Sequence, residues 1–116
     1  MPKRRFFTRH PLELEVEIQQ GRSWKTLRTI DVSRRGVFLR STEGAAVGRI
    51  LQMRIVLPET GRVELMGQIR RVVEHGEDSP LGPGIGVAFF ACSDDVAAAW
   101  DRFIIAHGRE AGPTFI

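Results

Sequence analysis

The arginines near the N-terminus are the first residues in this chain whose type and spacing suggest chemistry. Arg5 and Arg9 form an R-x-x-x-R motif, and Arg4 lies directly beside the first of them. A guanidinium group is planar and donates two parallel hydrogen bonds, which match phosphate oxygens or the O6 and N7 edge of guanine. The motif therefore predicts an anion site. A solvated basic arm is the alternative interpretation of the same residues.

A second polar cluster, Asp31-x-Ser33-x-x-Gly36, has complementary chemistry. The carboxylate of Asp31 can accept hydrogen bonds from the N1–H and N2–H₂ donors of guanine, and Ser33 can donate or accept. Gly36 lets the backbone turn tightly or approach a ligand closely. The same pattern is also ordinary turn chemistry, in which the side chains bond nearby backbone groups. Together the two clusters predict a site for a small anion built from guanine and phosphate.

In this order and at this spacing, the two motifs resemble those of the PilZ family, bacterial receptors for cyclic di-GMP. That family is marked by RxxxR at its N-terminal edge and by (D/N)xSxxG after its second strand. Both motifs are complete here, at residues 5–9 and 31–36. The Arg9-His10-Pro11 continuation and the late strand Gly84–Phe89 are also similar to the family. The resemblance extends over roughly residues 4–107, almost the whole chain.

The resemblance implies the identity of the ligand and the residues that hold it. Cyclic di-GMP would be bound without catalysis, and no other cofactor is implied. The implied contacts are Arg5 and Arg9 on phosphate and guanine, and Asp31, Ser33 and Gly36 on guanine. Arg4 and Arg35 are auxiliary candidates, and phosphate contact is open for Arg34 as well.

The elements that must position these residues can be outlined from the hydrophobic pattern. Apolar residues alternate with glutamates over 12–18, which predicts a half-buried strand. Further strands are expected at 24–30, 36–40, 50–57, 63–73 and 85–91, with residues 31–36 as a loop. Gly67 inside the longest strand predicts a bulge or bend. After Ser93 the period becomes helical up to His107, and Gly108 can end the helix.

This order of elements predicts an all-β domain with a C-terminal helix. Six short strands followed by one amphipathic helix favour a small antiparallel barrel that the helix caps. The resemblance implies the same fold, a six-stranded PilZ-type β-barrel. The expected organisation is a flexible N-terminal arm over 1–11, the barrel and helix over 12–108, and a tail over 109–116.

Composition places the chain among soluble, cytoplasmic proteins of one domain. It has 116 residues, 42% hydrophobic and 27% charged, and a net charge of only +3, which does not mark a nucleic-acid binder. No apolar run approaches the roughly 18 residues that cross a bilayer, and the basic N-terminus lacks the apolar region of a secretory signal. Because there is one cysteine, Cys92, no internal disulfide or structural zinc site is expected.

The residues that could support catalysis do not form a catalytic set. Ser33 and Asp31 make no triad without a histidine that the sequence can place beside them. Cys92 follows a strand and is expected to be a small buried residue rather than a nucleophile. Trp100 and Phe103 are expected in the core beneath the helix. The sequence therefore predicts a binding protein and no enzyme.

The expected mechanism is ordering of the arm around the ligand, which a protein partner then recognises. Fixing each arm residue costs about 1–2 kcal/mol of backbone entropy, so a dense, doubly charged ligand is needed. The expected process is the regulation of motility or of biofilm formation. The protein is expected to be a monomer or a weak dimer. Two alternatives stay open: a PilZ-like adaptor that binds proteins without a ligand, and a small nucleic-acid-binding barrel, for which the net charge of +3 is a poor fit.

Overall fold

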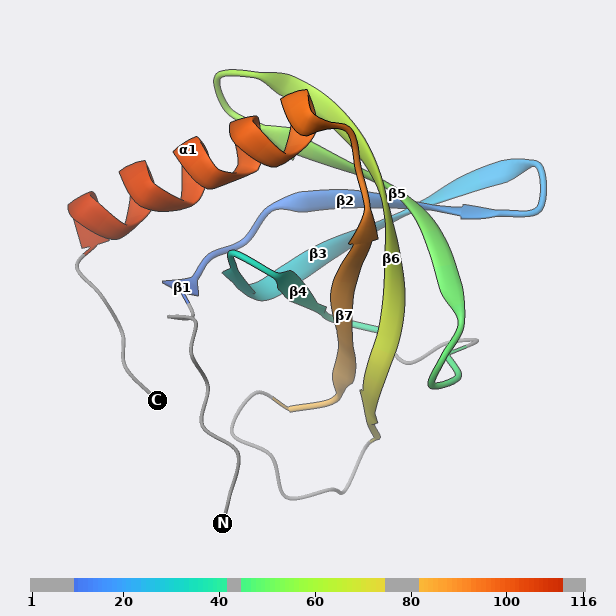
Figure 1. The fold of residues 1–116 in the computed structure, drawn as a ribbon. Helices are drawn as coiled ribbons and strands as arrows, with labels where there is room; N and C mark the ends of the chain where they lie inside the picture. The colour runs from blue at the N-terminus through green and yellow to red at the C-terminus, as the bar shows by residue number, and fades with distance from the viewer. Residues whose placement is uncertain (1–9, 42–44, 75–81, 112–116) are drawn as a thin grey trace, which may run out of the picture.

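The computed structural model describes residues 10–41, 45–74 and 82–111 and shows a curved antiparallel sheet with one helix across its end (Figure 1). The N-terminal motif residues Arg4, Arg5 and Arg9 lie outside the described residues. The elements are β1 (His10–Pro11), β2 (Glu15–Gln20), β3 (Ser23–Ser33), β4 (Gly36–Leu39), β5 (Ile50–Leu57), β6 (Gly61–Val73), β7 (Gly84–Ala91) and α1 (Asp94–Ala111).

The strands close into a barrel because β3, near one end of the sheet, also pairs with β4, the strand at the other end. The sheet order is β1-β3-β2-β5-β6-β7-β4, and a further pairing of β3 with β4 joins the two ends. All pairs are antiparallel. The prediction of a six-stranded antiparallel barrel with a C-terminal helix is confirmed, with the two-residue strand β1 as an addition.

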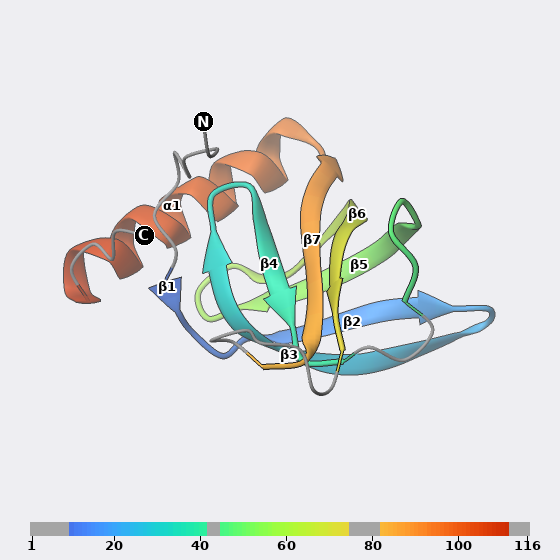
Figure 2. The ribbon, with the colours of Figure 1, turned by 90° about the horizontal axis from the view of Figure 1, so that it is seen from below.

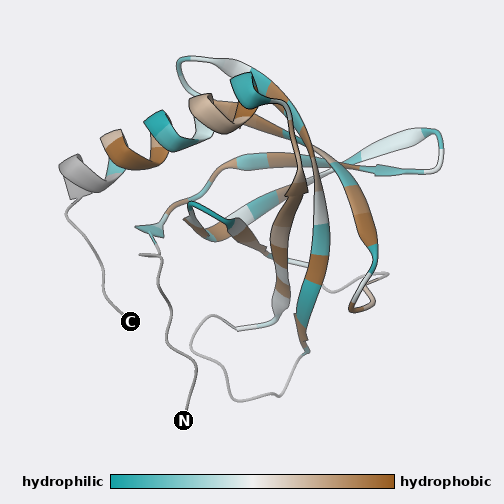
Figure 3. Cartoon of the chain, in the orientation of Figure 1, coloured by the Kyte–Doolittle hydropathy of each residue, from teal (hydrophilic) through white to brown (hydrophobic). Residues whose placement is uncertain are grey.

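Alternating side chains build the core, as the sequence pattern predicts. In β5, Leu51, Met53, Ile55 and Leu57 are buried while the residues between them are more exposed. Figure 3 shows this alternation as brown and teal segments along the strands. Because successive side chains of a strand point to opposite faces, one face of each strand fills the barrel and the other meets solvent.

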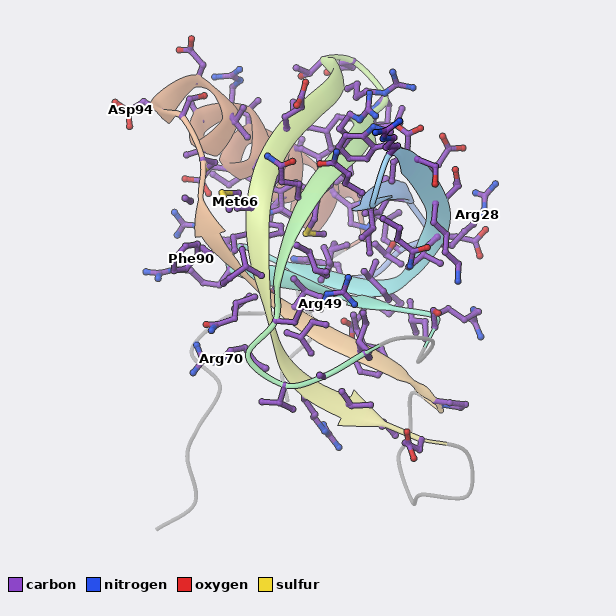
Figure 4. All side chains as sticks on the ribbon, turned by 90° about the vertical axis from the view of Figure 1, so that its right-hand side faces the viewer. Arg28, Arg49, Met66, Arg70, Phe90 and Asp94 are labelled. Atoms are coloured by element: carbon purple, nitrogen blue, oxygen red, sulfur yellow. The ribbon has the colours of Figure 1, made fainter. Side chains whose placement is uncertain are left out.

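The predicted bend at Gly67 is confirmed. The register between β6 and β7 shifts between Met66 and Gly67. A Cβ at Gly67 would collide with the Val87 side chain and would lie 2.7 Å from the Met53 sulfur. Glycine at this position therefore leaves room for two side chains of the core, Val87 and Met53. In the neighbouring strand β7, Met66 is opposite Ala91 and Gly67 is opposite Phe89, so Phe90 is the additional residue of the bulge. Its side chain is exposed (Figure 4).

Helix α1 begins at the predicted cap and lies across one end of the barrel (Figures 1 and 2). The Ser93 hydroxyl accepts a hydrogen bond from the backbone N–H of Val96 at 3.2 Å. The helix continues to Ala111, three residues past Gly108, where the sequence analysis placed its end. Glycine permits a helix end without enforcing one, and Pro113 is the next residue that breaks a helix. In the three described ranges, no helix combines the length and apolarity needed to cross a bilayer.

Candidate functional site

The second motif lies on a tight hairpin between β3 and β4. The sequence analysis expected a loop over 31–36, but Asp31 and Ser33 belong to β3, and Gly36 begins β4. Ser33 pairs with Gly36, so the turn itself contains only Arg34 and Arg35. The expectation of a loop was wrong because the motif residues take part in the sheet and only the turn between them is irregular.

Ser33 is fixed by hydrogen bonds on both its side chain and its backbone. Its hydroxyl accepts a hydrogen bond from the backbone N–H of Arg35 at 3.3 Å, the local turn bond that such residues commonly form. Its carbonyl oxygen accepts a hydrogen bond from the indole Nε1–H of Trp100 in α1, at 3.0 Å. The structural interpretation of the motif is thus confirmed for Ser33, and it leaves the ligand-binding interpretation open.

Gly36 is required by the packing of the barrel itself. A Cβ at this position would collide with the carbonyl oxygen of Val87 and would lie 3.2 Å from the Cα of Ala88, both in β7. Backbone atoms of a central strand cannot move aside without breaking the β4–β7 pairing. The glycine of the motif therefore has a structural reason that is independent of ligand clearance, which stays a prediction.

Asp31 is enclosed between two neighbouring strands. It pairs with Phe38 of β4 on one side and with Pro11 of β1 on the other. Its exposed fraction is 4%, and that of Ser33 is 5%. Both motif side chains are therefore almost completely buried at this end of β3.

The two turn arginines differ in their surroundings. Arg34 donates two hydrogen bonds to the carboxylate of Asp101 in α1, from Nε at 3.3 Å and from a terminal nitrogen at 3.2 Å. These bonds, and then the negative charge of Asp101, raise the pKa of Arg34 above its ordinary value. The carbonyl oxygen of Arg35 accepts a hydrogen bond from the backbone N–H of Phe89 at 2.8 Å. Arg35 itself is exposed. The side chain of Arg34 is thus directed to the helix.

Strand β1 lies against the second motif. His10 is opposite Val32 and Pro11 is opposite Asp31, although the sequence analysis assigned both residues to the arm. His10 is buried, and among the described residues its Nδ1 has no hydrogen-bond partner. Burial lowers the pKa of His10 below its ordinary value of 6.5, and the nearby His107 lowers it further. The neutral form is therefore favoured here.

Sequence reasoning missed the role of α1 at this site. Trp100 was expected in the core and is buried there, but its hydrogen bond to Ser33 was not anticipated. A signal existed, because a buried indole N–H usually finds an acceptor. Asp101 carried no comparable signal, since an acidic residue on a helix surface is ordinary.

Two other features bear on the chemistry of the site. A groove of about 800 Å³ lies between α1 and the strand ends, lined among others by Leu12, Leu57 and Phe103, but residues 31–36 do not line it.

Cys92 is exposed, so the expectation that it is buried was wrong: it follows the last residue of β7, where the sheet has ended. Within the described ranges, no three His, Cys, Asp or Glu side chains cluster as metal ligands would.

Comparison with known proteins gives a family and several similar folds. The family description "PilZ domain" matches residues 3–106. A structure of the Bacillus subtilis inhibitor of motility MotI/DgrA aligns with a TM-score of 0.76 and 18% identity, over 94% of this chain and 53% of that one. YcgR from Escherichia coli in complex with c-di-GMP aligns at 0.74 and 20%, over 94% and 48%. The PilZ domain of YcgR with c-di-GMP aligns at 0.69 and 21%, over 94% and 95%.

The similar structures match this chain over different shares of their own lengths. The chain spans about half the length of the MotI and full YcgR chains, so it corresponds to one part of each. At these identities the structures show a shared fold. No curated protein matched the sequence.

Proposed function

Since the chain belongs to the PilZ domain family, we propose that it is a receptor for cyclic di-GMP that binds the ligand through its RxxxR and DxSxxG motifs. The proposed activity is recognition without catalysis. Two of the similar structures, both of YcgR, contain c-di-GMP, which supports the choice of ligand.

The observation that carries the proposal is the position of β1. His10 lies opposite Val32, and the two side chains that flank Val32 in the sequence are Asp31 and Ser33. Arg9 is joined to His10 by one peptide bond. This pairing of the residue that follows the first motif with the strand that carries the second supports a single ligand site for both motifs.

The proposed contacts follow from the chemistry of each side chain. Arg5 and Arg9 bind phosphate oxygens and one guanine face, with Arg4 as an auxiliary. The carboxylate of Asp31 accepts hydrogen bonds from guanine, and Ser33 adds a further polar contact. Gly36 gives the ligand clearance beside the hairpin, and Arg35 in the turn is a further candidate for phosphate contact.

The proposed output is an altered surface around the ligand that a protein partner recognises. In this proposal the bound ligand orders the arm, so a partner that binds only the ligand-bound state responds to the second messenger. One of the similar proteins is named an inhibitor of motility, which makes motility the first process to examine. The proposed location is the cytoplasm.

Calorimetric titration of the purified chain with cyclic di-GMP tests the proposal. We expect binding in the wild type, and a loss of about 1.5–3 kcal/mol, or ten- to hundredfold in affinity, in Arg9→Ala and in Arg5→Ala, the scale of a hydrogen bond to a charged group. Asp31→Ala should weaken binding and reduce the preference for guanine over the adenine analogue cyclic di-AMP. Circular dichroism of each variant shows whether the barrel is folded.

The titration also separates the proposal from its alternatives. A wild-type chain that gives no heat and no thermal stabilisation with excess cyclic di-GMP would exclude the receptor function and favour a ligand-free adaptor. Affinity for oligonucleotides that grows with their length and falls steeply with salt would indicate a nucleic-acid-binding barrel instead. The fitted stoichiometry distinguishes one bound ligand from a pair.

A further inference from the structure

Helix α1 holds the motif hairpin at two consecutive residues. The indole of Trp100 donates a hydrogen bond to the carbonyl oxygen of Ser33, in a buried position. The next helix residue, Asp101, accepts two hydrogen bonds from Arg34, the next hairpin residue. Figure 2 shows the β3–β4 hairpin beside α1. The helix thus fixes both the backbone of the motif and the direction of one turn arginine.

The same helix face continues to the strand that follows the first motif. Ring contacts join Trp100 to Phe103 at 5.8 Å, Phe103 to His107 at 6.2 Å, and His107 to His10 at 5.6 Å between centroids. Phe89 of β7 contacts Trp100 edge-on at 5.0 Å. Because residues 100, 103 and 107 share one face of a helix, the same element contacts the hairpin of the second motif and strand β1, which follows the first motif.

From these contacts we propose that α1 is a positioning element for the ligand site, with Trp100 and Asp101 as its positioning residues. The inference rests on the proposed function and extends it from the motif residues to the helix. The helix holds the hairpin that carries Asp31 and Ser33 in one conformation, and it directs Arg34 toward Asp101. Ligand binding and helix docking are then coupled, and each strengthens the other by the same factor.

Titration of helix variants with cyclic di-GMP tests the coupling. Asp101→Asn removes the ion pair at an exposed position and should leave the fold intact, while Trp100→Phe removes the buried hydrogen bond. We expect affinity to fall about threefold in Asp101→Asn and about tenfold in Trp100→Phe, the range in which residues that touch no ligand change coupling. Arg34→Gln should weaken binding as much as Asp101→Asn, and the double variant no more than either, because all three break the same contact.

Asp94→Asn is the matched control. It removes the same charge from the same helix, at its first turn and directed away from the barrel (Figure 4). Binding by this variant should equal that of the wild type. If Asp101→Asn weakens binding no more than Asp94→Asn does, or if it tightens binding by freeing Arg34 for the ligand, the positioning role is excluded.

Hydrogen exchange gives the reciprocal measurement. Saturating cyclic di-GMP should slow amide exchange over residues 96–107 in the wild type, and should slow it less in Asp101→Asn. Equal slowing in both would contradict the coupling through Asp101. A wild type that does not bind the ligand would overturn the proposed function and this inference together, whereas wild-type binding with unaffected helix variants would overturn only the inference.

Discussion

The two ends of β3 carry similar two-residue turns in opposite surroundings. At its start, Gly21 and Arg22 form the tip of the β2–β3 hairpin, which extends away from the barrel (Figure 1). At its end, Arg34 and Arg35 form the tip of the β3–β4 hairpin, which is fixed by α1 and β7. We call the turn at Gly21 and Arg22 the free tip and the turn at Arg34 and Arg35 the fixed tip; β3 connects the two.

The difference lies in the range of the contacts. At the free tip the side-chain bonds are local: the Ser23 hydroxyl donates to the carbonyl oxygen of Gln20 at 3.2 Å. At the fixed tip, Ser33 is bonded to a helix residue 67 positions later in the chain. A turn sequence sets how the chain reverses direction, whereas long-range packing decides whether a turn can hold a ligand-binding geometry.

The largest expected effect comes from exchanging the glycine of each hairpin for alanine. Gly36→Ala forces a Cβ against the backbone of Val87 and should lower the free energy of unfolding by about 3 kcal/mol, the upper range of overpacking. Gly21→Ala meets no atom within 4 Å and strains only a backbone with φ of 59°, for about 1 kcal/mol. Urea denaturation of both variants measures the difference. Equal losses would contradict the distinction between a packed and a free turn.

A pH-dependent effect is expected at the fixed end, where His10 lies beside the second motif. The pKa of His10 is lowered in the folded state, so the unfolded chain binds more protons as the pH falls below 6.5. The contribution of His10 to stability should therefore be fully present above pH 6.5 and be lost as the pH falls from 6.5 through the lower folded-state pKa. Denaturation between pH 8 and 5.5 should show a shallower decrease in His10→Asn than in the wild type. Parallel curves would assign the decrease to other groups.

The smallest expected effect compares the serines at the two tips. Ser23→Ala removes an exposed local hydrogen bond and should change stability by less than about 0.5 kcal/mol. Ser33→Ala removes the acceptor of the Arg35 N–H in a buried position and should cost about 1 kcal/mol. Thermal unfolding of the pair measures this contrast. A larger loss in Ser23→Ala would show that the β2–β3 tip is constrained by contacts beyond its local bond.

Much of the fold was predictable because its signals are local. The alternation along β2 and β5, the bulge at Gly67 and the cap at Ser93 each depend on neighbouring residues and on the geometry of one element. The candidate site was predicted only as two motifs. Their relation was not predictable, because the pairing of His10 with Val32 depends on how β3 divides its edges among three strands.

By itself, the sequence determined the class of fold, the family and the residue types available for guanine and phosphate. These follow from spacing along the chain, which tertiary structure does not alter. Only the tertiary structure decided that Gly36 packs against β7, that Arg34 is held by Asp101, and that Ser33 is bonded to Trp100. Such contacts join residues far apart in the chain, so they are set by the closure of the barrel and the packing of α1. They cannot be predicted from the pattern of neighbouring residues.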